Sequence, residues 1–228
     1  AITTDSIAIP GCSVNRVRTR HPQRVHYQVV LDKGDARPLN ASTMKMNAAV
    51  LWDVHQEWSV EEVELDGPNE GEVLVSFEAT GLCHSDHHVR EGDLPLALPL
   101  VGGHEGAGIV QEVGPGVRNL NVGDHVVGLF LPACGRCRWC SSGHQNLCDL
   151  GAQMSTGAQL DGGFRRHAKG RSIGALSWLG TLAQYVAVPE ASVVQIDDDL
   201  PLNRACLVSC GVTTGYGSLA ELDAKAGA

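Results

Sequence analysis

Four closely spaced cysteines constrain this chain more than any other feature of its sequence. Cys134, Cys137, Cys140 and Cys148 follow the spacing C-x2-C-x2-C-x7-C in a segment rich in Gly, Ser and Arg. Four thiolates at such a spacing can surround a tetrahedral zinc ion and leave no coordination position for a substrate. The sequence therefore predicts a structural zinc site in a lobe of its own, which stabilises the fold and does no chemistry.

An iron–sulfur cluster is the alternative occupant of these cysteines, because C-x2-C-x2-C also opens bacterial ferredoxin motifs. Those motifs continue with x3-Cys-Pro, whereas here Cys148 follows Cys140 after seven residues and precedes Asp149. The spacing therefore favours zinc. Colour separates the two cheaply, since a zinc protein is colourless and a cluster is brown.

Composition narrows the class of protein. The chain has 228 residues, 43% of them apolar and 19% charged, which is typical of a globular protein with one sizeable core. Its net charge of −9 argues against nucleic acid as a partner, which needs a basic face. The sequence contains no run of about 18 apolar residues, so it predicts no membrane span. Clustered cysteines without a signal peptide favour metal over disulfides, and hence a cytoplasmic location.

The chain changes character near residue 44. Residues 1–43 carry six Lys and Arg against three Asp and Glu and lack sustained periodicity, which predicts a leader, either disordered or non-native upstream sequence. A targeting peptide is the alternative, but the acidic residues in this segment are untypical of one. Short strands separated by Gly, Pro and Asp turns follow, so we expect a mainly β fold with short helices and a partly closed barrel. Expected strands cover 48–52, 60–65, 72–77, 106–113, 124–130, 183–188 and 192–196, and expected helices cover 85–91 and a stretch from 202 into the 220s.

A second set of metal-ligand residue types is spread over distant segments. Cys83, His104 and Cys210 form a Cys2His set, and three protein ligands with an open fourth position are typical of a catalytic zinc site. Spacing alone does not select these three, because the chain contains ten histidines. Cys12 and Cys206 fit neither set, and we interpret them as idle or buried thiols.

Four motifs together resemble one family. They are residues 81–88 (GLCHSDHH), 102–108 (GGHEGAG), the four-cysteine segment and residues 210–217 (CGVTTGYG). They resemble the zinc-containing medium-chain alcohol dehydrogenases, and the resemblance runs from about residue 44 to 218. It implies a GroES-like barrel, a catalytic zinc and a structural zinc. Residues 46–52 and 151–180 are most similar to the actinobacterial branch, some members of which hold their nicotinamide cofactor without exchanging it.

The resemblance assigns the metal-site residues. Cys83, His104 and Cys210 would hold the catalytic zinc, with Asp86 orienting His104. Glu105 would lie beside that ion and approach it transiently. The structural zinc would be held by Cys134, Cys137, Cys140 and Cys148.

The resemblance also assigns a proton path and cofactor contacts. Ser85 would hydrogen-bond the substrate hydroxyl and pass its proton to His88 near solvent, a task that suits a histidine. Thr214 would touch the nicotinamide ring. His84 stands where many relatives place Arg to bind the cofactor pyrophosphate, and it lacks the guanidinium fork. We therefore expect weaker pyrophosphate contact here, and a His84→Arg variant should release the cofactor more slowly.

A glycine motif near the end of the chain is misleading. Residues 215–220 satisfy G-x-G-x-x-G/A, but the motif should follow a strand and be trailed about 20 residues later by an acidic residue. Residues 203–214 predict a helix instead, and only eight residues follow the motif. Residues 44–218 are thus expected to be the catalytic domain, and 219–228 the start of a connection to a dinucleotide-binding domain not contained in this sequence.

The function implied by the resemblance is NAD-dependent oxidation of an alcohol or reduction of an aldehyde in the complete protein. Two zinc ions per chain, NAD and a small alcohol or aldehyde would be the ligands, and full-length relatives usually form homo-oligomers. Oxidation of a thiol adduct of formaldehyde is an alternative that the same zinc site would support. A zinc-binding fragment without turnover of its own is the alternative of another class.

Overall fold

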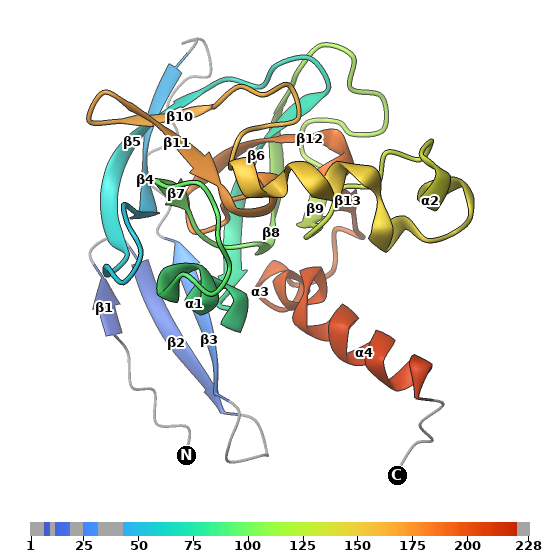
Figure 1. Cartoon of the computed structure of the whole chain (residues 1–228), viewed down its shortest axis with the longest axis horizontal. Helices are drawn as coiled ribbons and strands as arrows, with labels where there is room; N and C mark the ends of the chain where they lie inside the picture. Colours follow the sequence, from blue (N-terminus) through green and yellow to red (C-terminus); the bar gives the residue numbers. More distant parts are fainter. Residues whose placement is uncertain (1–6, 10–11, 19–24, 32–42, 223–228) are drawn as a thin grey trace.

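The computed structural model of this protein describes residues 7–9, 12–18, 25–31 and 43–222, which form a five-stranded closed barrel beside an eight-stranded sheet (Figure 1). The strands are β1 (Ile7–Ile9), β2 (Cys12–Arg18), β3 (Val25–Leu31), β4 (Thr43–Leu51), β5 (Ser59–Asp66), β6 (Glu72–Gly81), β7 (Leu100–Val101), β8 (Glu105–Val113), β9 (His125–Gly128), β10 (Arg166–Ala168), β11 (Arg171–Ala175), β12 (Tyr185–Pro189) and β13 (Val193–Gln195). The helices are α1 (His84–Glu91), α2 (Arg138–Ser141), α3 (Leu202–Ala205) and α4 (Gly211–Glu221), with 3-10 turns η1 (Gln145–Leu147), η2 (Asp149–Thr156), η3 (Leu176–Trp178), η4 (Glu190–Ser192) and η5 (Cys206–Ser209). The mainly β fold expected from the sequence is confirmed.

The barrel is closed by strands β10, β11, β7, β4 and β5 in that order. In β5 the side chains of Val63 and Leu65 are buried while Glu62 and Glu64 are exposed, because alternate residues of a strand face opposite sides. The buried members pack with β4, β11 and β12 in one continuous core. The alternation of apolar and acidic residues therefore determines which face of β5 packs into the core and which faces solvent.

Strand β6 pairs with three other strands of the larger sheet. It pairs with β3 and β12 on one edge and with β8 on the other, which leaves most of its residues buried. At the end of this pairing Gly81 lies opposite Glu105. The residues just after β6 and just before β8, Cys83 and His104, are thereby brought close to each other.

Some expected elements differ from the observed ones. Strands β1, β2 and β3 lie within the first 43 residues, where the sequence patterning indicated no regular structure, and whether that segment is a leader stays a prediction. Strands β7, β10 and β11 were missed, since strands this short acquire their conformation from long-range pairing rather than from local pattern. No helix in the described part of the chain has both the length and the apolar character needed to cross a membrane.

The long helix expected from residue 202 is interrupted. Helix α3 and the turn η5 lead to Cys210, whose backbone is not helical (φ −142°, ψ −65°), and α4 then begins at Gly211. Just before the break, the Ser209 hydroxyl donates to Gly106 O at 3.2 Å and accepts from Gly106 N at 3.3 Å, which ties this segment to β8. Helix α4 extends away from the sheets, and none of its residues is buried (Figure 1).

Candidate metal centres

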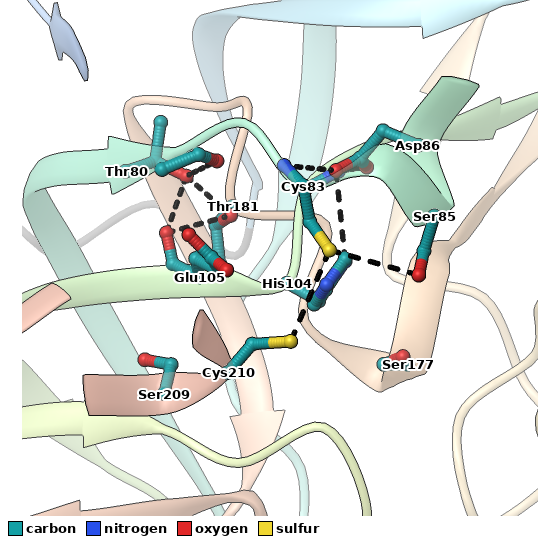
Figure 2. Close-up of polar contacts among 12 residues, drawn as sticks. Thr80, Cys83, Ser85, Asp86, His104, Glu105, Ser177, Thr181, Ser209 and Cys210 are labelled. Carbon is teal, nitrogen blue, oxygen red and sulfur yellow. Dashed lines mark hydrogen bonds and ion pairs between the residues drawn. The ribbon is translucent and has the colours of Figure 1, made fainter. Parts of the chain in front are cut away.

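Residues from three distant segments meet at the end of β6. One ligand atom each from Cys83, His104, Glu105 and Cys210 lies within 4.8 Å of every other in this group. Figure 2 shows the two sulfur atoms and the imidazole converging, with 3.9 Å between Cys83 Sγ and Cys210 Sγ. The three predicted ligands of a catalytic zinc are thus brought together, although nothing in their sequence spacing required it.

Local structure explains how each of these side chains is placed. Cys83 immediately precedes α1, where an extended backbone (φ −91°, ψ 154°) ends the loop after β6. His104 directly precedes β8 and is fully buried, with Phe130 packed edge-on against its ring at 5.0 Å. Cys210 lies at the break between η5 and α4. Two strand ends and one helix break therefore supply the three side chains.

The Asp86 carboxylate connects two of these segments. It is 4% exposed and accepts hydrogen bonds from Gly103 N at 2.7 Å and Cys83 N at 3.2 Å. One of its oxygens lies 3.7 Å from His104 Nδ1. Burial raises the pKa of Asp86, and His104 together with the two backbone N–H groups offsets this only in part. The carboxylate thus lies next to the His104 ring and links the loop before β8 to the start of α1.

The chemistry of the donor set fits a zinc ion. Both ring nitrogens of His104 are buried and lack a hydrogen-bond partner, which is costly for a polar group unless another ligand satisfies it. Thiolate and imidazole are the ligands that zinc prefers, and a dication here would supply the charge that the buried Asp86 and Glu105 carboxylates face.

The pKa values of the two thiols of this cluster shift in opposite directions. Contact with the Cys210 thiol lowers the pKa of Cys83 to about 3, and the same contact, together with burial, raises the pKa of Cys210. Burial lowers the pKa of His104, but its neighbours Cys83 and Asp86 outweigh this and raise it. Burial also raises the pKa of Glu105 to about 7, with the Cys83 charge adding to the effect. Cys83 is therefore the more acidic of the two thiols.

Several supporting residues were missed by sequence reasoning. Thr80 Oγ1 donates to Glu105 O at 2.5 Å and lies 2.7 Å from Thr181 Oγ1, and both threonines are fully buried. Ser177 and Trp178 have left-handed backbones, with φ of 56° and 62°, in the segment for which no structure was expected. No local signal could have found these contacts, because the two threonines are 101 residues apart.

The remaining predicted site residues surround the cluster. Ser85 Oγ lies 3.6 Å from Cys83 Sγ, and Thr214 Oγ1 lies 3.9 Å from Cys210 Sγ. His84 and His88 are exposed on α1, and His88 Nδ1 lies 3.0 Å from an Asp93 carboxylate oxygen. The structure thus brings the hydroxyls of Ser85 and Thr214 to the sulfur atoms, while the two histidines face solvent.

The second group of metal ligands is the cysteine lobe, residues 134–148. One sulfur atom from each of Cys134, Cys137, Cys140 and Cys148 lies within 4.8 Å of the others. Backbone N–H groups donate to three of these sulfurs, at 3.3 to 3.5 Å. Hydrogen bonds from Asp149 and Cys140 lower the pKa of Cys137 to about 6, whereas burial raises the pKa of Cys140 to about 12. This donor set also fits a tetrahedral zinc ion.

Comparison with known proteins found clear sequence relatives. Residues 69–198 match the family described as the alcohol dehydrogenase GroES-like domain. The chain is 52% identical over 175 residues to the putative alcohol dehydrogenase D of Mycobacterium tuberculosis, which covers 77% of this chain and 48% of the relative. It is 51% identical over 175 residues to an NDMA-dependent alcohol dehydrogenase of Amycolatopsis methanolica, and this match covers 77% of this chain and 47% of that protein.

A solved structure supports the same relationship. The alcohol dehydrogenase zinc-binding domain protein of Burkholderia ambifaria superposes with a TM-score of 0.73 at 36% identity, over 78% of this chain and 48% of that protein. The chain spans about half the length of the curated relatives it matches. Its fold, its two clusters of metal-ligand residues and these similarities lead to one conclusion: the chain belongs to the alcohol dehydrogenase family with a GroES-like domain.

Proposed function

We propose that Cys83, His104 and Cys210 hold a catalytic zinc ion and that the cysteine lobe holds a structural one. The convergence of the three side chains within 4.8 Å, together with Glu105, is the observation that carries the proposal. Two thiolates and a neutral imidazole balance the charge of Zn2+, and a zinc ion with three protein ligands acts as a Lewis acid on a substrate oxygen. The four sulfurs of the lobe would leave no position for substrate.

Asp86 is the positioning residue of this site. The hydrogen bonds that it accepts from Gly103 N and Cys83 N anchor the carboxylate next to His104. Asp86 Oδ2 lies 3.7 Å from His104 Nδ1, and a closer approach would let the carboxylate accept the Nδ1 hydrogen and leave Nε2 free for the metal. Glu105 would lie next to the ion, within the same group of ligand atoms.

Ser85 and His88 would move the proton of the reaction. The Ser85 hydroxyl, 3.6 Å from Cys83 Sγ, is at the edge of the cluster, where it would hydrogen-bond a substrate hydroxyl. His88 is one helical turn further along α1 and exposed, so it would receive the proton and release it to solvent. Its contact with Asp93, at 3.0 Å, would hold the ring in position.

The cofactor would be NAD, bound mainly by a domain beyond the sequence described here. Thr214, near Cys210 on α4, would contact the nicotinamide, and His84 would approach the pyrophosphate. Residues 44–218 would form the catalytic domain and 219–228 the start of the connection to the cofactor domain. The complete protein would then interconvert a small alcohol and its aldehyde, as oxidoreductases of this family do.

Zinc content tests the site assignments. We expect two zinc ions per chain by elemental analysis, one after Cys83→Ser and one after Cys137→Ser, because each variant loses one ligand set. In the complete protein, Ser85→Ala should lower kcat for alcohol oxidation with NAD, whereas Ser141→Ala, on the lobe surface, is the matched control and should not. A Cys83→Ser variant that keeps two zinc ions would refute the catalytic assignment.

A further inference from the structure

Helix α1 carries three exposed histidines on one surface. The ring centroids of His84 and His88 are 4.7 Å apart, and that of His87 lies 5.3 Å from His84 and 6.4 Å from His88. Residues at i and i+4 are neighbours on a helix face, and here the rings of His84 and His88 meet edge to face, with 77° between their planes. Two histidines at this spacing on one helix face are a recurrent metal-binding pair.

Carboxylate oxygens lie near the Nδ1 atoms of two of these rings. His88 Nδ1 lies 3.0 Å from Asp93 Oδ2, and an ionised carboxylate can only accept, so Nδ1 of the ring carries the hydrogen. In the neutral ring Nε2 then keeps a free lone pair. His87 Nδ1 has a weaker counterpart, 3.9 Å from Glu91, and Glu91 also lies 3.6 Å from His55 Nδ1. A carboxylate behind a histidine is the usual arrangement around metal ligands.

We propose that His84 and His88 chelate an exchangeable divalent transition-metal ion from solution, a site separate from the two cysteine clusters. The pair offers two imidazole nitrogens, and water would complete the coordination sphere. Imidazole ligands suit Ni2+, Cu2+ and Zn2+, and the order of affinities places Cu2+ first. The neighbouring carboxylate of Asp93, 3.0 Å from His88 Nδ1, adds negative charge that attracts a cation, whereas Glu91 is paired with Arg90.

Occupation of this site would inhibit the enzyme. His88 is the outlet of the proton path in the proposed function, and a metal on its Nε2 would replace the proton it must carry. This consequence rests on the proposed function, whereas metal binding itself does not. Excess zinc would therefore slow turnover without displacing the ions held by cysteines.

Nickel binding to the zinc-loaded full-length chain tests the site. We expect isothermal titration calorimetry to detect a Ni2+-binding event that is lost in both His84→Gln and His88→Gln. His87→Gln, the matched control on the same helix, should keep it. Asp93→Asn should weaken it by about 10–100-fold, because the carboxylate orients the His88 ring. Zinc content, measured after gel filtration, must stay unchanged by nickel.

The possible outcomes separate the proposals. Nickel binding that is unaffected by both His84→Gln and His88→Gln would overturn the site, as would loss of binding only in His87→Gln. Failure of the proposed function would instead appear as unchanged zinc content in the Cys83→Ser variant. The two results are independent, because one measures a histidine pair on the surface and the other a buried cysteine.

Discussion

Replacement of Asp86 by asparagine changes the charge of one buried group while keeping its shape. In the native protein both carboxylate oxygens accept: Oδ1 from Gly103 N at 2.7 Å, and Oδ2 from Cys83 N at 3.2 Å. An asparagine keeps one acceptor and introduces an NH2 group in place of the other. If the remaining oxygen stays on Gly103 N, the NH2 group faces the N–H of Cys83, so two donors oppose each other.

The size of the effect follows from these contacts. A buried donor left without an acceptor costs about 1–3 kcal/mol of the free energy of unfolding. In a domain of this size each kcal/mol lowers Tm by about 2–4 °C. The contact between Asp86 and His104 weakens as well, and loss of such an orienting carboxylate typically costs about 10–100-fold in metal affinity.

Two measurements check this reasoning. Urea unfolding at fixed zinc concentration should give the loss of stability, and competition with a chelator should give the loss of zinc affinity. Asp198→Asn removes an exposed carboxylate beyond β13 and is the control, with an expected change within about 0.5 kcal/mol. An Asp86→Asn variant with native Tm and native zinc affinity would refute the proposed role of the carboxylate.

Three further perturbations probe other parts of the structure. Gly81→Ala would place a Cβ against Glu105 Oε2, so we expect a loss of about 1–3 kcal/mol in urea unfolding, partly restored by adding Glu105→Asp; equal stability of single and double variants would contradict the clash. Cys137→Ser should lower Tm in thermal melts without any chelator, because the lobe loses its ion, and a melting curve identical to that of the native protein would argue against a structural ion. Glu72→Ala removes the carboxylate that accepts from Arg165 at 2.8 and 2.9 Å, while Arg165 keeps its contact with Asp161, so we expect a loss of about 1.5–3 kcal/mol in the free energy of unfolding by denaturant titration; a loss no larger than that of a surface substitution would contradict a stabilising role for this pair.

The sequence predicted the parts of the fold whose residues follow a local pattern. The alternation of apolar and acidic residues in β5 predicted its buried and exposed faces, and the helix expected over residues 85–91 is α1. The cysteine lobe was also predictable, because its four ligands lie within a single short segment.

Features that depend on contacts between distant segments were not predictable. The break at Cys210 was missed because residues 202–222 have continuous helical character, and only the hydrogen bonds between Ser209 and Gly106 mark the interruption. Thr80 and Thr181 belong to no sequence motif, and only the structure shows that their hydroxyls lie next to each other and that Thr80 donates to Glu105 O. Grouping Cys83, His104 and Cys210 required the resemblance to a family, since ten histidines offered too many combinations.

The ligands of the proposed catalytic zinc come from three separate segments, which has a consequence for folding during synthesis. Cys83 and Cys210 are 127 residues apart, so the cluster stays incomplete during synthesis until the last of its segments leaves the ribosome. A metal ion joining them closes a long loop, and such closures remove the most entropy from the unfolded chain. Binding of the ion would therefore link two distant parts of the domain and stabilise only the folded chain.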